Sequence, residues 1–288
     1  MAKKLSEMKI GLVLSGGGAK GAYQIGMMRA LEELGISKQI KVISGTSIGA
    51  FNALSYAVGG TEKMREVMKN FYPCYERGMD NDVSDLQTAK DRVMSGAVGM
   101  DEFISDPSYR RSSSKPFAEY MRTALPDELL KKYTAKVYAC AYSLEDACPR
   151  YFALNDLPAE EQRQIVIASG SLSFVFPPIA YRGQHYLDGG EIPEICQNGA
   201  PEDKIPLLPA VGMGLDAIIV SFLIASDTVN TGLVPLATIY RELRPSVPLE
   251  AYPGAGTLDF SPEKLASHEA LGYADTLRSF ADKAIEEL

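Results

Sequence analysis

Apolar and polar positions along the first sixty residues predict strands that alternate with helices. Short apolar runs at 9–15 and 40–44 each lead into glycines, which is typical of buried parallel strands that end in tight turns. The stretch 21–34 carries apolar residues on two helical faces, which predicts a buried helix, and 48–58 predicts a second helix. Gly26 lies inside the first helix and predicts close backbone packing there. This alternation is typical of an α/β protein with a parallel sheet.

The rest of the chain combines a more polar segment with further apolar runs. Residues 61–133 predict helices near 62–71 and 116–124, and we expect either a helical cap over the sheet or an ordinary helical excursion. No repeat or linker divides the chain, so we predict one domain over 8–288 with a motif-bearing core at 10–210. Further strands are expected at 136–144, 150–154, 181–187 and 216–225, and further helices at 157–169 and 262–288.

Composition excludes several classes of function. The chain has 288 residues, 46% of them hydrophobic, and a formal net charge of −8, so it can form a core but has no basic surface for nucleic acid. Two histidines and four cysteines without CxxC spacing argue against a zinc site or a disulfide scaffold, and favour reduced thiols. Lys3 and Lys4 resemble the start of a signal peptide, but the apolar run after them is too short. We therefore expect a soluble, unprocessed, cytoplasmic protein.

A glycine loop follows the first predicted strand and precedes the first helix. Its sequence SGGGAKG, residues 15–21, presents consecutive amides at a helix N-terminus, where negative charge binds. Gly16, Gly18 and Gly21 match the dinucleotide fingerprint, but the second strand lacks the acidic residue that would hold a ribose. A Walker A loop is excluded because Lys20 precedes Gly21 instead of a serine or threonine. Dinucleotide binding is thus a minor alternative.

A second motif, Gly45-Thr46-Ser47-Ile48-Gly49, lies between the second strand and the second helix. This G-x-S-x-G pattern places a serine on a sharp strand-to-helix turn, with small neighbours that let a substrate carbonyl approach. A serine that caps a helix explains Ser47 but neither glycine. We interpret Ser47 as a nucleophile. Because loops that follow parallel strands meet at one edge of the sheet, the loop at residues 16–18 can supply amides for an oxyanion.

The nucleophile also needs a base. Ser47, Asp188 and His268 follow the order of an α/β-hydrolase triad, but only two predicted strands precede Ser47. His268 lies in a Lys/Glu-rich helical tail, so we expect it on a solvated face, whereas His185 is expected on a strand face. Asp188 ends an apolar strand and precedes two glycines, which makes it the better candidate base.

The motifs SGGGAKG, GTSIG and DGG occur in this order and resemble those of the patatin-like phospholipases, or patatin-like lipid acyl hydrolases. The segment Ala168-Ser169 followed by Phe176-Pro177-Pro178 adds to the resemblance. It implies a three-layer α/β/α fold with a mostly parallel sheet, and a catalytic dyad in which Ser47 is the nucleophile and Asp188 the proton acceptor. It implies an oxyanion hole formed by the amides of Gly16, Gly17 and Gly18. The motif residues that support these groups are Lys20, Gly21, Gly45, Gly49, Gly189 and Gly190.

The resemblance also implies a substrate class. Members of the family hydrolyse acyl esters of phospholipids, lysophospholipids and other glycerolipids through an acyl-serine intermediate. That chemistry requires no metal, although some relatives use calcium or a partner protein, and we expect no cofactor for this chain. For this chain we therefore expect a lipid ester substrate, transient contact with a membrane surface, and no nucleic-acid partner. Aromatic residues of the cap could line an acyl channel, although ordinary packing explains most of them equally well: Tyr72, Tyr75, Phe103, Tyr109, Phe117 and Tyr120.

The chain departs from the family pattern after Asp188. An Asn-x-Pro motif is expected a few residues later, but here Asn198 and Pro201 are displaced, and Pro206 is the candidate for the proline's place. This departure motivates an alternative function, a catalytically weak lipid- or acyl-binding regulatory module on the same fold.

Overall fold

The computed structural model describes residues 3–78, 99, 102, 105, 106, 113–173, 175–190, 199–250 and 256–281. Its centre is an eight-stranded sheet in the order β5-β6-β3-β2-β1-β7-β8, with β4 paired to β3 outside this path. The strands are β1 (Ile10–Leu14), β2 (Ile40–Thr46), β3 (Lys136–Ser143), β4 (Cys148–Ala153), β5 (Ile179–Tyr181), β6 (Gln184–Asp188), β7 (Ala217–Ser221) and β8 (Ile239–Leu243).

Five neighbouring strands, from β3 through β2, β1 and β7 to β8, run parallel, and β4, β5 and β6 add antiparallel pairs at one side. Every residue of β1 and of β7 is buried, which explains why these strands appear in the sequence as continuous apolar runs. The predicted α/β class and mostly parallel sheet are confirmed.

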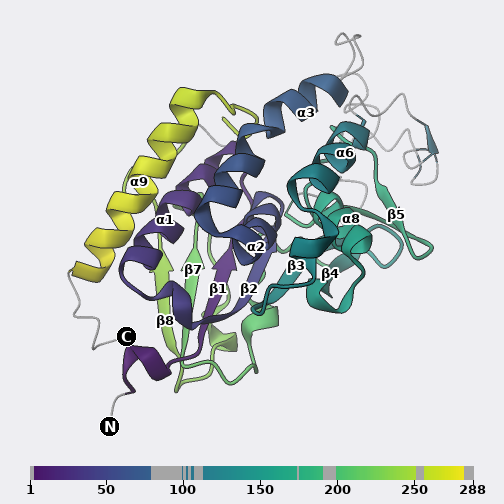
Figure 1. The fold of residues 1–288 in the computed structure, drawn as a ribbon. Helices are drawn as coiled ribbons and strands as arrows, with labels where there is room; N and C mark the ends of the chain where they lie inside the picture. The colour runs from purple at the N-terminus through teal and green to yellow at the C-terminus, as the bar shows by residue number, and fades with distance from the viewer. Residues whose placement is uncertain are drawn as a thin grey trace.

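Helices cover one face of this sheet (Figure 1). Apolar side chains of α1, α2, α6, α8 and α9 join the main core cluster together with inward residues of the strands. The helices are α1 (Ala22–Glu33), α2 (Ile48–Lys69), α3 (Phe71–Gly78), α6 (Lys115–Ala124), α7 (Asp127–Leu130), α8 (Ala159–Ser169) and α9 (Pro262–Ala281).

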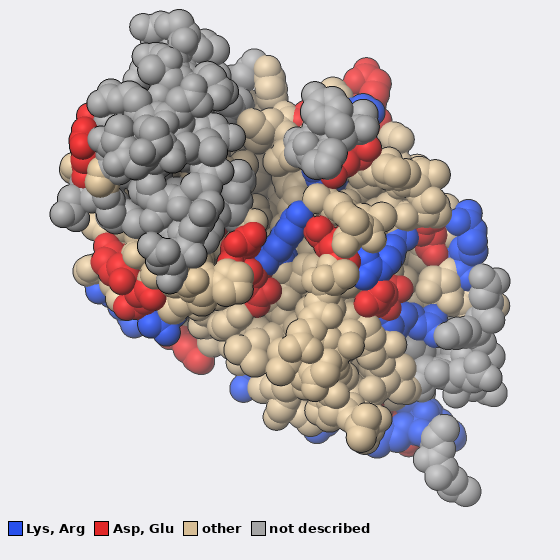
Figure 2. Space-filling model, turned by 180° about the vertical axis from the view of Figure 1, so that it is seen from behind, with Lys and Arg blue, Asp and Glu red and all other residues tan. Residues whose placement is uncertain are grey.

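The opposite face is covered mainly by the segment 205–215, which contains the short 3-10 helix η8 (Leu208–Ala210). Its apolar residues pack on Val13, Val42 and Val220 of the sheet. Among the described residues this layer holds no α-helix, which modifies the expected α/β/α arrangement. Seen from behind, acidic and basic side chains are interspersed, and those that the structure describes form no basic area on this face (Figure 2).

Most helices agree with their sequence predictions. Helix α2 combines the two helices expected at 48–58 and 62–71, which are separated by non-helical conformations at Gly59 and Gly60. In the predicted cap, α6 matches the helix expected at 116–124, while 79–98 and 107–112 lie outside the described residues. The predicted strand 181–187 is instead a hairpin, because Arg182 and Gly183 adopt positive φ angles between β5 and β6. The predicted domain boundaries remain predictions.

Helices α1 and α9 cross with their backbones in close contact (Figure 1). A Cβ atom added to Gly26 would lie 1.8 Å from the carbonyl oxygen of Glu269. A Cβ atom added to Gly272 would lie 2.0 Å from the carbonyl oxygen of Tyr23. The close packing predicted for Gly26 is therefore confirmed. Gly272 of α9 makes the corresponding close contact with the backbone of α1.

Replacing either glycine with alanine should force the two helices apart. We expect Gly26→Ala and Gly272→Ala each to lower the free energy of unfolding by at least about 2 kcal/mol, since overpacking costs about 1–3 kcal/mol even where neighbours adjust. Urea denaturation followed by circular dichroism measures the change. Ser267→Ala, at an exposed position of α9, is the matched control and should leave the stability nearly unchanged. Unaltered stability in Gly26→Ala would contradict the close approach.

Candidate active site

Ser47 occupies a strained turn between β2 and α2. Its φ of 56° and ψ of −128° lie in a region that residues with a side chain rarely adopt. The two glycines of the motif permit this turn, because added Cβ atoms at Gly45 and Gly49 would each lie 2.2 Å from a backbone oxygen, that of Gly49 and that of Leu14 respectively. The G-x-S-x-G spacing therefore reflects a backbone approach too close for any side chain.

Hydrogen bonds hold this turn in place. The backbone N–H of Ser47 donates to Oγ of Ser169 at 2.9 Å, and that hydroxyl donates in turn to the carbonyl oxygen of Cys140 on β3. On the helix side, the N–H of Ala50 donates to the carbonyl oxygen of Ser47 at 2.9 Å. Ser169, the last residue of α8, thus connects the turn to the sheet. Sequence reasoning noted Ser169 only as part of a family segment and did not predict this role.

Strand pairing brings Asp188 to the carboxyl end of β2, which Ser47 directly follows. Along one edge of β3, Cys140 pairs with Thr46 of β2 and the next residue, Ala141, pairs with Asp188 of β6. Strand β2 runs parallel to β3 and β6 runs antiparallel to it, so the two strands approach each other and their carboxyl ends meet. Ser47 directly follows one of these ends and Asp188 is the last residue of the other.

Asp188 is buried, with 1% of its surface exposed. Its N–H donates to the carbonyl oxygen of Ser171 at 2.9 Å, and its Oδ1 accepts from the N–H of Gly190 at 2.8 Å. The end of α8 and the residues after it therefore hold both members of the predicted dyad, Ser47 through Ser169 and Asp188 through Ser171. Ser47 and Asp188 both line one cavity of about 750 Å³.

The glycine loop lies against Ser47. An added Cβ atom at Gly16 would lie 3.2 Å from Cβ of Ser47, and Gly18 has a φ of 61° that favours glycine. The N–H of Gly16 donates to the carbonyl oxygen of Lys204 at 2.9 Å, so it is occupied. Within the described part of the chain, the N–H groups of Gly17 and Gly18 make no hydrogen bond. An oxyanion hole at this loop stays a prediction, and the amides of Gly17 and Gly18 are the ones that are not already paired with a described residue.

The remaining motif residues support this arrangement. Lys20 is buried, and its Nζ lies 2.7 Å from Oε2 of Glu250 and 3.2 Å from Oγ1 of Thr257. These contacts connect the helix η2 (Gly18–Gly21) to a segment that returns from the C-terminal part of the chain. Gly21 closes η2 against the side chain of Ile48, Gly189 packs against Cys140, and Gly190 packs against Lys204.

The described part of the altered segment after Asp188 is held by hydrogen bonds beside both residues of the predicted dyad, at Gly189 and at Thr46. The N–H of Asp203 donates to the carbonyl oxygen of Gly189 at 2.8 Å, and Oγ1 of Thr46 donates to that of Asp203 at 2.7 Å. The carbonyl oxygen of Pro206, the candidate replacement for the family's proline, accepts from Oγ of Ser44 at 2.6 Å. Asn198 lies outside the described residues.

Neither histidine lies beside Ser47. The expectation of a solvated face for His268 is wrong: the side chain is 6% exposed and contacts the backbone of Ala19 and Leu249. Burial lowers the pKa of His268, and Lys264 and Lys20 lower it further. The Lys and Glu residues of α9 concealed the face of the helix that packs inward, to which His268 belongs. His185 lies on β6 as expected, and its Nδ1 is 2.7 Å from Oε1 of Glu145.

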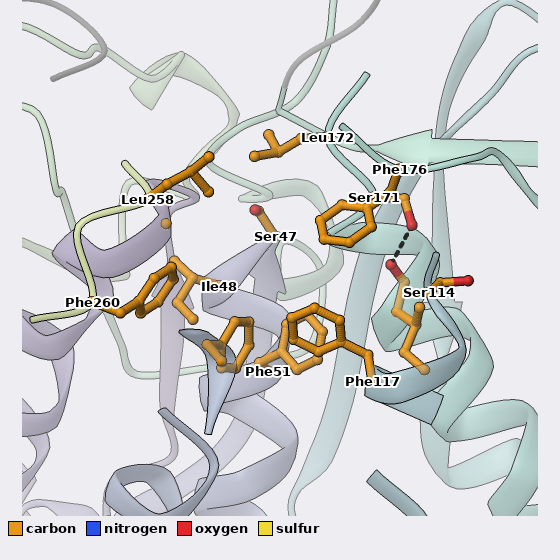
Figure 3. A pocket seen from close by; sticks show the side chains of 14 residues that line it. Ser47, Ile48, Phe51, Ser114, Phe117, Ser171, Leu172, Phe176, Leu258 and Phe260 are labelled. Atoms are coloured by element: carbon orange, nitrogen blue, oxygen red, sulfur yellow. Dashed lines mark hydrogen bonds between the residues drawn. The ribbon is translucent and has the colours of Figure 1, made fainter. Parts of the chain in front are cut away.

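A second, apolar pocket adjoins Ser47 (Figure 3). Side chains of Ile48, Leu172 and Leu258 lie around the serine, together with aromatic rings. Of the cap aromatics considered as channel residues, Phe117 lines this pocket, Tyr72 is exposed, and Oη of Tyr120 donates to the carbonyl oxygen of Glu66. The side chain of Tyr75 is not described, and Phe103 and Tyr109 lie outside the described residues. The pocket is lined by Phe51, Phe71, Phe117, Phe176 and Phe260, most of which the sequence analysis did not select.

Two further features are absent from the described residues. No group of three or more His, Cys, Asp or Glu side chains among them is arranged to hold a metal ion. None of the helices in these ranges combines the length and the apolar character needed to cross a membrane.

These features define an α/β protein with a serine on a strained strand-to-helix turn, a buried carboxylate that lines the same cavity, and two loop amides that make no hydrogen bond in the described part of the chain. The sequence model of the patatin-like phospholipase family matches residues 12–203, and the chain belongs to this family.

Among curated proteins, the chain is 30% identical over 222 residues to lysophospholipase nte1 of Aspergillus terreus, a match that covers 76% of this chain and 12% of that protein. It is 30% identical over 233 residues to lysophospholipase NTE1 of Cryptococcus neoformans, covering 76% of this chain and 11% of that protein. The chain thus corresponds to a small part of these relatives. Among solved structures, VipD from Legionella pneumophila is similar with a TM-score of 0.45 and 15% identity, over 96% of this chain and 67% of VipD.

Removing the Ser169 hydroxyl should loosen the strained turn. In Ser169→Ala the buried N–H of Ser47 loses its acceptor, which costs about 1–3 kcal/mol. We expect the labelling of Ser47 by a fluorophosphonate to slow by about tenfold, which corresponds to about 1.4 kcal/mol, while the fold is kept. Mass spectrometry over time measures the labelling. Ser55→Ala is the matched control, because the buried Oγ of Ser55 has no partner among the described residues. Equal labelling rates in Ser169→Ala and the wild type would contradict the role of Ser169.

Buried His268 should make the fold sensitive to acid. Its pKa in the folded state is lowered, whereas an unfolded histidine titrates near about 6.5. Below this pH the unfolded chain therefore binds a proton that folded His268 does not, and the free energy of unfolding falls. The melting temperature should drop between about pH 7.5 and pH 5.5, and drop less in His268→Gln. His185→Gln, which removes the half-exposed histidine, should not reduce the drop. An identical drop in His268→Gln and the wild type would refute this explanation.

Proposed function

We propose that this protein is a serine acyl hydrolase that cleaves carboxylic ester bonds of lipids, with Ser47 and Asp188 as its catalytic dyad. The pairing of β2 and β6 along one edge of β3 carries this proposal, because it brings a strained serine and a buried carboxylate to one point. Membership of the patatin-like phospholipase family supports the same chemistry.

The arrangement accounts for each step of an acyl transfer. Oγ of Ser47 attacks the ester carbonyl carbon while Asp188 accepts its proton, and the N–H groups of Gly17 and Gly18 stabilise the oxyanion. The tetrahedral intermediate collapses, the C–O bond breaks, and the alcohol leaves with the proton that Asp188 returns. Water then attacks the acyl-serine, again with Asp188 as proton acceptor, and release of the carboxylic acid regenerates Ser47.

The two cavities at Ser47 support a lipid ester as the substrate. The apolar pocket suits an acyl chain, while the larger cavity contains charged and polar residues, including Lys20, Lys204 and Asp259, and suits the alcohol part. The matched relatives are named lysophospholipases, and we extend the proposal to phospholipids, lysophospholipids or other glycerolipids. Transient contact with a lipid surface would deliver such a substrate. No step requires a metal or other cofactor.

We further propose that the protein acts in a cytoplasmic compartment. Cys74, Cys140 and Cys148 are free thiols, which fits a reducing environment.

The dyad is tested by labelling and turnover together. A fluorophosphonate should add once to the wild type and not at all to Ser47→Ala. Hydrolysis of lysophosphatidylcholine should fall by at least about a thousandfold in Ser47→Ala and in Asp188→Asn, as when a nucleophile or its base is removed. Fatty-acid release and intact mass are the measurements, with melting curves to confirm folding.

Asp146→Asn is the matched control, because it makes the same change at a surface carboxylate that pairs with Arg150. It should keep wild-type turnover. Full activity in a folded Asp188→Asn variant would exclude Asp188 as the base. Acyl-ligand binding by the wild type without labelling or turnover would favour a binding module instead.

A further inference from the structure

Five phenylalanine rings fill the apolar pocket beside Ser47, and we call them the phenylalanine cluster. Phe71 is at its centre, with ring centroids 4.7 Å from Phe51, 5.2 Å from Phe117 and 5.4 Å from Phe260. The rings of Phe117 and Phe176 follow at 5.5 Å. Most pairs meet edge to face, an arrangement that adds attraction to the burial of apolar surface.

The rings come from different parts of the fold. Phe51 belongs to α2, whose first turn carries the residues after Ser47, so it is fixed relative to the nucleophile. Phe71 and Phe117 lie on α3 and α6, two helices of the predicted cap that pack on each other. Figure 3 shows Phe117 and Phe51 together on one side of Ser47, with Leu172 and Leu258 on the other. Two rings of the pocket wall, those of Phe71 and Phe117, therefore come from helices of the predicted cap.

Little room remains between these rings. The pocket has a volume of about 50 Å³, whereas an apolar cavity of about 150 Å³ holds one benzene molecule. The pocket as it stands therefore has room for only a short acyl segment beside Ser47. A longer chain would have to occupy space that the rings of Phe71 and Phe117 now fill.

We propose that the phenylalanine cluster limits the length of the acyl chain, and that Phe117 is a specificity-determining residue. Short acyl groups enter the pocket as it stands, whereas longer ones require Phe71 and Phe117 to move away with their helices. This proposal rests on the proposed function, since it concerns the acyl part of an ester attacked by Ser47. In this proposal the phenylalanine cluster selects acyl esters by the length of the acyl chain. The alcohol part of the ester does not affect this selection.

Phe117 is the best position for a test. Its ring is buried and contacts both Phe71 and Phe176, so its removal opens space in the middle of the pocket. It makes none of the hydrogen bonds that hold Ser47 or Asp188. A change at Phe117 therefore alters the acyl site and leaves the reacting groups in place.

The experiment measures kcat/KM for p-nitrophenyl butanoate, octanoate and dodecanoate. We expect the wild type to favour butanoate over dodecanoate by at least about tenfold, and Phe117→Ala to raise the dodecanoate-to-butanoate ratio by at least about tenfold, within the range that pocket fit commonly supplies. Phe117→Leu, which keeps an apolar side chain and folds more readily, should raise the ratio by a smaller factor. Phe152→Ala is the matched control, because that ring packs on Tyr181 and Tyr186 outside the pocket.

The outcomes separate the two proposals. If the wild type cleaves no ester and takes up no fluorophosphonate, the proposed function fails. If it cleaves esters and is labelled, but Phe117→Leu and Phe117→Ala keep the wild-type ratio, only the length limit is overturned. A wild type that prefers dodecanoate also overturns the length limit. A rise in Phe152→Ala equal to that in Phe117→Ala would attribute the effect to general loosening and reject Phe117 as the determinant.

Discussion

Strand β3 pairs along one edge with two strands that run toward each other, and the positions of Ser47 and Asp188 depend on this junction. Cys140 and Ala141 are consecutive, so Thr46 and Asp188, their partners, must lie at neighbouring positions. A parallel strand alone would place only one carboxyl end there. The antiparallel β6 brings the second, from a segment more than a hundred residues later. Helix α8 then secures the junction through Ser169 and backbone contacts of the residues after it.

The junction also explains which parts of the fold and site were visible in the sequence. The close approach of Gly45 to the backbone of Gly49 lies within the motif itself, so the motif alone predicts Ser47 on a sharp turn. Asp188 was selected because an apolar strand and two glycines frame it. The hydrogen bond from the amide of Gly16 to the carbonyl oxygen of Lys204 is not visible in the sequence, because the two residues are far apart along the chain. A local sequence pattern shows which structure a segment can adopt. It does not show which distant group will hydrogen-bond to that segment in the fold.

Elements at the edges of the fold were harder to predict for a similar reason. Strand β8 was missed because its residues Tyr240, Arg241 and Glu242 are amphipathic and only its last residue is buried. His268 was placed in solvent because charged neighbours surround it in the sequence, although α9 turns that position toward the glycine loop. The phenylalanine cluster draws rings from α2, α3 and α6 and from beyond α8, so no periodicity within one segment identifies it.

The chain that follows Asp188 returns to the site at fixed points on either side of residues 191–198. Gly189 accepts from Asp203, and Ala200 donates to the carbonyl oxygen of Ala147 at 2.8 Å. These two hydrogen bonds fasten the described chain on either side of this stretch to the turn after β6 and to the turn between β3 and β4. Both attachments are made by backbone groups, so no side chain takes part in holding them.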